Sequence, residues 1–375
     1  MKIVLTGGGT GGHFYPLIAV AEKINTIRDR DNLANLDIYY LSDKKYDKKI
    51  LYENNIKFRQ VYAGKLHLTP SLKTLFHIFK TFIGILQAFF TVFTIFPDVV
   101  FSKGGYAAFP TVLAAKILKI PVILHESDSA PGRVNIWTGK FAKAIAVSYK
   151  QDVDYFPIEK VIHTGQPIRE NLESPAKEGA YEFLGLTRDV PILWVLGGSS
   201  GSRILNATIE ESLPILLEKY QIIHQVGESN LEDMKKMTDA SLMSNEYRNR
   251  YKQFGRLNQL SMKMIAGVAD IVITRAGSSL FEIAHWEIPS IVIPITVSHK
   301  NHQIKNAYNY ARDGACVVIE ENNLSDKLLT FEINRIFDNE DIKKEMREGA
   351  RRFDIDGAAE EIAEELVGIA LAHER

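Results

Sequence analysis

Two glycine-rich turns, each directly after a short apolar stretch, constrain the fold of this chain more than any other sequence feature does. The first turn, GGGTGG at residues 7–12, follows KIVLT at residues 2–6. The second, GGSSGS at residues 197–202, follows PILWVL at residues 191–196. A strand, a turn without side chains and the N-terminus of a helix together form an anion-binding site. One such site at the start of each half predicts two similar lobes with a phosphate-bearing ligand between them.

Length and composition fit two globular domains. The chain has 375 residues, of which 46% are hydrophobic and 24% charged, and its net charge is −1. A chain of this size can bury two cores, and a balanced charge argues against a nucleic-acid binder. Cys316 is the single cysteine, which excludes an intrachain disulfide and favours a reducing compartment. The N-terminal apolar run ends too early for a signal peptide, so we expect a cytoplasmic location.

Strand-like apolar runs alternate with helix-like stretches along both halves. Strands are expected at residues 2–6, 37–41, 98–102, 121–125 and 144–148, and again at 192–196, 221–226, 271–274, 290–294 and 315–319. Such alternation predicts parallel sheets with helices on both faces. The expected fold class is α/β, with two doubly wound, Rossmann-like domains facing a deep cleft, at residues 1–166 and 167–356. The last stretch, residues 357–375, is helical in composition and is expected to pack back on the first domain.

Residues 71–96 form the most hydrophobic part of the chain. The uncharged portion after Lys80 falls short of the about 20 apolar residues of a membrane span, so a helix buried against the sheet is one interpretation of residues 82–96. The first half predicts contact with an anionic membrane surface, because cations flank a single apolar helical face. The residues expected at the membrane are Leu72, Leu75, Phe76, Phe79, Lys73 and Lys80.

The first glycine turn alone is compatible with several phosphate ligands. Its spacing loosely satisfies the dinucleotide fingerprint, with Asp43 in the place of the ribose-binding acid. A P-loop does not fit, because no Lys-Ser/Thr pair follows either turn.

Two polar segments follow strands of the second half. RAGSSLFE at residues 275–282 places backbone N–H groups to meet a phosphate and Glu282 to accept bonds from ribose hydroxyls. A carboxylate that only complements the helix dipole is the alternative for Glu282. Gln303 and Asn306 share a helical face and suit a neutral polyhydroxyl ligand. A metal site at His299 and His302 lacks a third ligand.

Taken together, these segments resemble the MurG family of UDP-N-acetylglucosamine:lipid I N-acetylglucosaminyltransferases. The strings that carry the resemblance are GGGTGGHFYP, SKGGYAAFP, HESDSAPGRVN, GQPIR, GGSSGSRILN, RAGSSLFEIA and HQIKNA. The resemblance implies the GT-B fold and an inverting transfer of GlcNAc from UDP-GlcNAc to the C4 hydroxyl of MurNAc in lipid I, forming lipid II. It also implies a role in peptidoglycan synthesis, cell shape and cell division, peripheral attachment to the cytoplasmic face of the cell membrane, and contacts with other cell-wall synthesis proteins.

The resemblance further assigns binding residues position by position. The donor-binding residues are Thr10, Gly11, Gly12, Asp128, Arg169, Ser199, Ser278, Ser279, Leu280, Phe281, Glu282, Gln303 and Asn306. The residues expected at the acceptor diphosphate are Gly8, Gly9, Gly104, Gly105 and Tyr106. Asp128 stands where family members commonly have an amide. No residue is assigned to the uracil within residues 254–262, because that segment does not align cleanly.

An inverting displacement makes two chemical demands: the leaving diphosphate must be stabilised, and the attacking hydroxyl must lose a proton. Helix N-termini after the second-half loops, together with Arg169, suit the first demand. For the second, His13 is the leading candidate because the ordinary pKa of histidine is near 6.5. Asp128 is the alternative base, and Glu126 is a third.

No metal cage is expected. Metal-dependent transferases of the other common fold use an Asp-x-Asp string, and residues 152–154 and 354–356 have that form. Neither string ends a predicted strand, so both are interpreted as solvated loop carboxylates. A divalent cation is therefore not required, although it can assist the leaving group. Two other functions stay open: another transferase or an epimerase of the same fold, and a non-catalytic subunit that binds a sugar nucleotide or recruits partners to a membrane.

Overall fold

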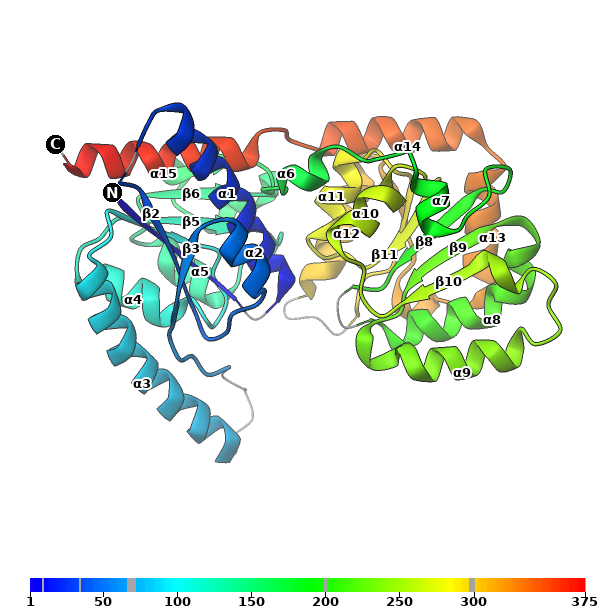
Figure 1. Ribbon diagram of the computed structural model, residues 1–375, viewed down its shortest axis with the longest axis horizontal. Coiled ribbons are helices and arrows are strands. Elements are labelled where there is room, and N and C mark those ends of the chain that lie inside the picture. The colour runs from blue at the N-terminus through cyan, green and yellow to red at the C-terminus, as the bar shows by residue number, and fades with distance from the viewer. Residues whose placement is uncertain (9, 34, 66–71, 199–200, 297–300, 375) are drawn as a thin grey trace. The chain divides into compact units, whose positions relative to one another are not determined.

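The computed structural model describes residues 1–8, 10–33, 35–65, 72–198, 201–296 and 301–374, and the side chains of residues 72–75 and 374 lie outside the description. The chain divides into two compact units (Figure 1): unit 1 is Met1–Glu170 with Ile355–Arg375, and unit 2 is Asn171–Asp354. The boundary thus follows Glu170 rather than residue 166, and Arg169 belongs to unit 1.

Unit 1 is built on a parallel sheet whose described strands have the order β3-β2-β1-β4-β5-β6-β7. The strands are β1 (Lys2–Thr6), β2 (Asp37–Ser42), β3 (Ile56–Gln60), β4 (Val99–Ser102), β5 (Val122–Glu126), β6 (Ala144–Val147) and β7 (Val161–His163). In the register, Ile3 pairs with Ile38 of β2 on one side and with Val99 of β4 on the other. The strand order therefore reverses between β1 and β4, and ligands of such sheets bind at the carboxyl ends beside the reversal.

Helices cover both faces of this sheet. They are α1 (Gly11–Arg30), α2 (Lys48–Glu53), α3 (Leu72–Ile95), α4 (Phe109–Ile117), α5 (Arg133–Gly139), the short 3-10 helices η1 (Lys150–Tyr155) and η2 (Ile158–Lys160), and α15 (Ala358–Glu374). Because side chains alternate along a strand, Ile3 and Leu5 of β1 join the core under α1 and α15, whereas Val4 joins the core under α3 and α4. The C-terminal helix thus completes the core of the N-terminal unit, where Leu366 is fully buried.

Unit 2 repeats the plan with described strands in the order β10-β9-β8-β11-β12-β13. The strands are β8 (Ile192–Leu196), β9 (Gln221–Gln225), β10 (Tyr251–Phe254), β11 (Ile271–Thr274), β12 (Ser290–Val292) and β13 (Cys316–Val318). Its helices are α7 (Ala180–Leu184), α8 (Arg203–Lys219), α9 (Leu231–Ser241), α10 (Gln259–Ala266), α11 (Ser279–His285), α12 (His302–Arg312), α13 (Asp326–Phe337) and α14 (Glu340–Phe353), with α6 (Glu170–Glu173) at the boundary and 3-10 helices at Glu228–Asn230, Arg248–Arg250 and Glu321–Asn323. The order reverses between β8 and β11, so the loops that follow these two strands occupy the equivalent binding position.

The fold contains three strands that the sequence patterns missed: β3, β7 and β10. β3 and β7 are the two edges of the first sheet, and β10 is an edge of the second. All ten expected strands are present, half of them with slightly shorter bounds.

Candidate functional site

The carboxyl ends of β1 and β4 carry the first cluster of predicted site residues. A Cβ atom on Gly105 would lie 3.3 Å from the Gly8 carbonyl oxygen and 3.3 Å from His13 Cε1, so the turns that follow the two strands touch. The structure thus brings Gly8, Gly105 and His13 together. Gly9 lies outside the described residues.

The ring of His13 is oriented by the turn that precedes it. Its Nδ1 atom is 3.1 Å from the Gly8 carbonyl oxygen and 3.4 Å from Thr10 Oγ1. A carbonyl oxygen can only accept a hydrogen bond, so Nδ1 carries the proton and Nε2 keeps the lone pair. The predicted donor residues Thr10, Gly11 and Gly12 form the N-cap and first turn of α1 beside this imidazole.

The turn after β4 is shaped by side chains from two other elements. Gly104 has a φ of +75°, and a Cβ atom there would lie 1.8 Å from Asn135 Oδ1, so a side chain at this position does not fit. Tyr106 donates its hydroxyl to Asp43 Oδ2 at 3.1 Å. Burial and then the Asp43 carboxylate raise the pKa of Tyr106 to about 12, so the phenol remains a donor at neutral pH. Asp43, which the dinucleotide fingerprint would use to bind a ribose, therefore orients the Tyr106 hydroxyl.

The segment after β5 carries the other two candidate bases. The buried Glu126 carboxylate accepts hydrogen bonds from the backbone of Ser127 at 2.8 Å, Asp128 at 3.0 Å and Gly132 at 3.3 Å, and from Asn135 Nδ2 at 2.8 Å. Burial and then the Asp128 charge raise the pKa of Glu126, while the bonds from the Asp128 backbone and the Asn135 side chain, and the Lys103 charge, oppose the shift. A buried carboxylate with four donors organises a loop, whereas Asp128 is only half-buried.

Arg169 lies in unit 1 and not in unit 2, where the predicted domain boundary placed it. It is buried, and its guanidinium carbon lies 4.0 Å from the centroid of the Tyr15 ring. Stacking on an aromatic face restrains the planar guanidinium group. Its contact with a donor diphosphate stays a prediction.

A glutamine from the neighbouring strand holds the second glycine-rich turn. Gln225, the last residue of β9, donates from Nε2 to the Gly198 carbonyl at 2.8 Å and accepts from the Leu257 backbone N–H at 3.1 Å. Ser202 caps α8 through its side chain. Ser199 lies outside the described residues. Gln225, which the sequence patterns did not single out, thus ties the turn after β8 to the loop after β10.

Arg275, directly after β11, links further loops at the same edge of the second sheet. Its guanidinium group donates to the Ser202 hydroxyl and to the Ile293 carbonyl at 2.9 Å. It also forms an ion pair with Glu321 at 2.6 Å, and the two side chains are 9% and 13% exposed. Because breaking such a buried pair leaves an uncompensated charge, Arg275 fixes the loops after β8, β12 and β13 relative to one another.

The predicted phosphate-binding backbone lies at the start of α11. Ser278 is the N-cap residue, and Ser279 begins the helix. The side chains of Leu280 and Phe281 are buried. Their backbone N–H groups donate to the Gly277 and Ser278 carbonyl oxygens at 3.1 and 3.2 Å, so their contact with a phosphate stays a prediction. Glu282 is half-buried in the first turn of the helix. Because β11 pairs with β8 in the sheet, the start of α11 with Glu282 follows the strand next to the one that the second glycine-rich turn follows. The phosphate and ribose contacts of this segment stay predictions.

The two amides of α12 have structural partners. Asn306 is 1% exposed and donates to the Ala276 carbonyl at 3.1 Å. Gln303 accepts from the Ile295 backbone N–H at 3.1 Å. Both residues hold the loops that follow β11 and β12, and their contact with a sugar stays a prediction. His299 lies outside the described residues.

The two Asp-x-Asp strings differ from the expectation of solvated carboxylates. That expectation is wrong for Asp152, which is fully buried in η1. It is also wrong for Asp354, whose carboxylate contacts His285 Nδ1 at 2.8 Å and is 15% exposed. Asp154 and Asp356 are exposed. The sequence could not reveal these environments, because each depends on what a distant segment packs against the aspartate.

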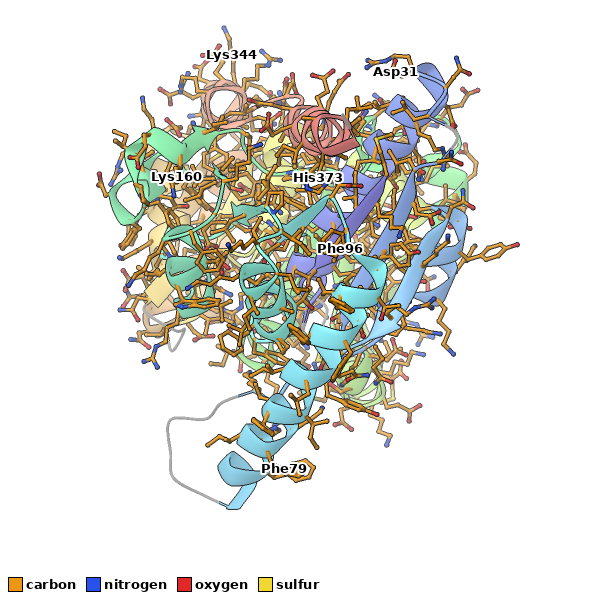
Figure 2. The ribbon with its side chains drawn as sticks, turned by 90° about the vertical axis from the view of Figure 1, so that its left-hand side faces the viewer. Asp31, Phe79, Phe96, Lys160, Lys344 and His373 are labelled. Carbon is orange, nitrogen blue, oxygen red and sulfur yellow. The ribbon has the colours of Figure 1, made fainter. Side chains whose placement is uncertain are left out.

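The apolar segment forms one long helix with two different faces. In Figure 2, α3 extends outward from unit 1, with Phe79 near its far end. The exposed apolar side chains that recur at helical spacing, here called the apolar stripe, are Phe79, Phe82, Leu86, Phe90 and Phe93. On the opposite face Ala88 and Val92 are fully buried. The interpretation of residues 82–96 as a buried core helix is therefore wrong for one face and right for the other.

Of the other residues expected at the membrane, the structure describes the side chains of Phe76 and Lys80. Phe76 is 65% exposed, and Lys80 Nζ lies 5.8 Å from the centroid of the Tyr62 ring. The side chains of Leu72, Lys73 and Leu75 lie outside the description. Among the described residues, Phe76–Ile95 is the one helix that is long and apolar enough to cross a membrane, with a mean hydropathy of 1.8. Length and composition alone are weak support for a span.

Comparisons with known proteins cover nearly the whole chain. The Glycosyltransferase family 28 N-terminal domain matches residues 3–147, and the Glycosyltransferase family 28 C-terminal domain matches residues 192–364. A Bacillus cereus UDP-N-acetylglucosamine–N-acetylmuramyl-(pentapeptide) pyrophosphoryl-undecaprenol N-acetylglucosamine transferase 2 is 34% identical over 92% of this chain and 93% of the relative. A Clostridium botulinum transferase of the same description is 33% identical over 91% and 92%.

Solved structures share the fold at lower identity. The crystal structure of Acinetobacter baumannii MurG has a TM-score of 0.71 at 22% identity, covering 98% of this chain and 99% of that one. A Neisseria meningitidis UDP-GlcNAc 2-epimerase bound to UDP-GlcNAc has a TM-score of 0.68 at 14% identity, covering 98% and 100%. These likenesses establish the fold alone, while the sequence matches decide membership. The chain belongs to glycosyltransferase family 28 and, within it, to the MurG family of N-acetylglucosamine transferases with the GT-B fold.

Proposed function

We propose that this chain transfers GlcNAc from UDP-GlcNAc to the C4 hydroxyl of the MurNAc unit of lipid I, forming lipid II with inversion at the anomeric carbon. The observation that carries the proposal is 34% identity to a transferase of that description over 92% of the chain. Supporting it, the turns after β1 and β4 and those after β8 and β11, which carry part of the residues that resemble the family's site, follow the strands beside each reversal of strand order.

The nucleotide is assigned to unit 2. The turns after β8 and β11 offer backbone N–H groups to a diphosphate, and Glu282 offers a carboxylate to vicinal ribose hydroxyls. Gln225 and Arg275 hold these turns in place before any ligand arrives. Preorganised donors of this kind stabilise a leaving group by about 3 kcal/mol each.

The acceptor is assigned to unit 1, with His13 as the general base. The Nδ1 proton points to the Gly8 carbonyl, so Nε2 is the nitrogen that takes the proton of the attacking hydroxyl. The half-buried Asp128 is the alternative base. Glu126 is the weaker candidate, because four N–H donors already occupy its carboxylate.

The deciding experiment incubates the purified protein with UDP-[labelled GlcNAc] and synthetic lipid I, followed by chromatographic identification of the product. Label in lipid II is the expected result. Transfer to diacylglycerol instead, or conversion of UDP-GlcNAc to its 2-epimer without acceptor, would establish one of the alternative enzymes. Binding of UDP-GlcNAc by calorimetry with no product from any acceptor would identify a non-catalytic subunit. Repeating the assay in EDTA tests the proposal that no metal is required.

Peripheral attachment to the cytoplasmic face of the cell membrane is part of the same proposal. The apolar stripe runs for about 21 Å along α3, since a helix rises about 1.5 Å per residue. An exposed apolar face of this length at the end of a unit is typical of a helix that lies in the membrane interface. Lys80 and the lysines nearby favour anionic lipids. Such attachment would keep the enzyme beside a lipid-linked acceptor.

A further inference from the structure

A buried lysine that the proposed chemistry does not use lies beneath the predicted acceptor site. Lys103 directly follows β4 and is 1% exposed. Its ammonium group contacts His125 Nδ1 and Ser127 Oγ, and it lies 3.5 Å from Gln166 Oε1. The side chain therefore connects the end of β4 with the segments that follow β5 and β7.

The lysine is the hydrogen-bond donor in this cluster. His125 Nε2 is 2.9 Å from the Gly165 carbonyl, so Nε2 carries the proton and Nδ1 presents a lone pair to Lys103. Burial, followed by the charge of Lys103, holds the pKa of His125 well below its ordinary value. The imidazole is thus neutral, and the three acceptors around the ammonium group are all uncharged. The opposing charges that act on the ammonium group are those of Glu126 and Asp128.

Burying this charge is costly for the fold. Removal from water lowers the pKa of Lys103 to about 7, although the carboxylates of Glu126 and Asp128 oppose the shift. A methionine of similar volume would avoid that cost, but it would leave His125 Nδ1, Ser127 Oγ and Gln166 Oε1 without the donor that they face. These two effects on stability oppose each other, so the contacts of the lysine show what its charge does.

The partners of Lys103 point to what the charge does. Its own backbone continues into Gly104 and Gly105, and Ser127 immediately precedes Asp128. We propose, on the basis of the proposed function, that Lys103 is a positioning residue for the acceptor: its ammonium group holds Ser127 against the turn that is predicted to bind the acceptor diphosphate. Because it is buried, Lys103 acts through these residues and does not touch the substrate.

Steady-state kinetics on Lys103→Met, with Lys143→Met as the control, tests this role. Lys143 is an exposed lysine of the same unit. We expect Lys103→Met to fold with a Tm close to that of the parent protein, because the relieved cost of the buried charge and the acceptors left without a donor oppose each other. Its kcat/KM for synthetic lipid I should fall at least tenfold, while its KM for UDP-GlcNAc should change less than twofold. Lys143→Met should match the parent in every measurement.

Ser127→Ala provides an independent measurement if Lys103→Met does not fold. It removes one partner of the lysine, so kcat/KM for lipid I should fall with KM for UDP-GlcNAc unchanged, and adding it to Lys103→Met should cause little further loss. Unchanged kcat/KM for lipid I in either folded variant would overturn the inference, as would an equal rise in both KM values. Failure of the parent protein to make lipid II would instead refute the proposed function.

Discussion

Replacing two phenylalanines of the apolar stripe tests how this protein reaches its acceptor. Phe79 and Phe90 are 61% and 64% exposed on the same face of α3. A phenylalanine buries about 200 Å² when it is fully covered, so roughly 60% exposure leaves about 120 Å² per ring, or about 3 kcal/mol at about 25 cal/mol per Å². If each ring enters the bilayer to half its depth, Phe79→Ser with Phe90→Ser loses about 3 kcal/mol in total, which weakens vesicle binding about 100-fold.

Vesicle cosedimentation measures this loss directly. The double variant and the parent are compared on anionic and on zwitterionic vesicles, and the stronger binding to anionic vesicles should persist because Lys80 and its neighbours are retained. Phe331→Ser is the matched control, since Phe331 is 60% exposed on α13 of unit 2. It should bind vesicles as the parent does. Equal binding by the double variant, or an equal loss in Phe331→Ser, would refute the assignment of the apolar stripe to the membrane.

Three further variants probe the catalytic chemistry, the donor site and the buried lysine. His13→Ala should lower turnover about 10²-fold with UDP-GlcNAc binding intact, and unchanged turnover would remove His13 from the mechanism. Gln225→Leu removes the two hydrogen bonds that join the turn after β8 to the loop after β10, so calorimetry should find about tenfold weaker UDP binding. An unaltered affinity would mean that these two hydrogen bonds do not contribute to nucleotide binding. The pKa of Lys103 falls from 10.5 to about 7 on folding, so the cost of its charge is fully present below pH 7 and disappears as the pH rises to 10.5. At about 1.4 kcal/mol per pKa unit the upper bound of that cost is about 5 kcal/mol. The Tm of Lys103→Met relative to that of the parent should therefore be higher at pH 6 than at pH 10, and a difference that does not change with pH would contradict the reasoning.

The central strands were predictable because each is buried on both faces. β1, β8 and β11 are nearly continuous apolar runs, which is the pattern of a strand in a parallel sheet covered by helices. β3 and β7 have half of their residues or more exposed, so their sequences lack that pattern. An edge strand needs one neighbour only, and its formation depends on the sheet that is already present.

The turns of the site were predictable, but the side chains that hold them were not. The glycine-rich turns are encoded locally by residues next to one another in the chain. Lys103 meets Gln166, and Gln225 meets Leu257, only because the strand order places their segments side by side. Asn306 is a further example. The sequence predicts a sugar-binding amide there, and only the fold shows that its side chain donates to the Ala276 carbonyl. A contact between distant segments is a property of the topology, and a single sequence gives little access to it.

The contacts that the buried face of α3 makes with the rest of unit 1 distinguish a peripheral helix from one that crosses the membrane. A Cβ atom on Gly84 would lie 1.6 Å from the Tyr62 carbonyl oxygen, and the Gln87 side chain accepts from the Tyr62 backbone N–H at 3.0 Å. A helix that crossed the bilayer would have to give up these contacts and the burial of Ala88 and Val92. Gly84→Leu should therefore lower the Tm by several degrees, as overpacking of about 1–3 kcal/mol does in a domain of this size. Carbonate at high pH should release the parent protein from membranes. A parent that resists carbonate, together with a Gly84→Leu variant of unchanged Tm, would mean that this face meets lipid and that α3 spans the membrane.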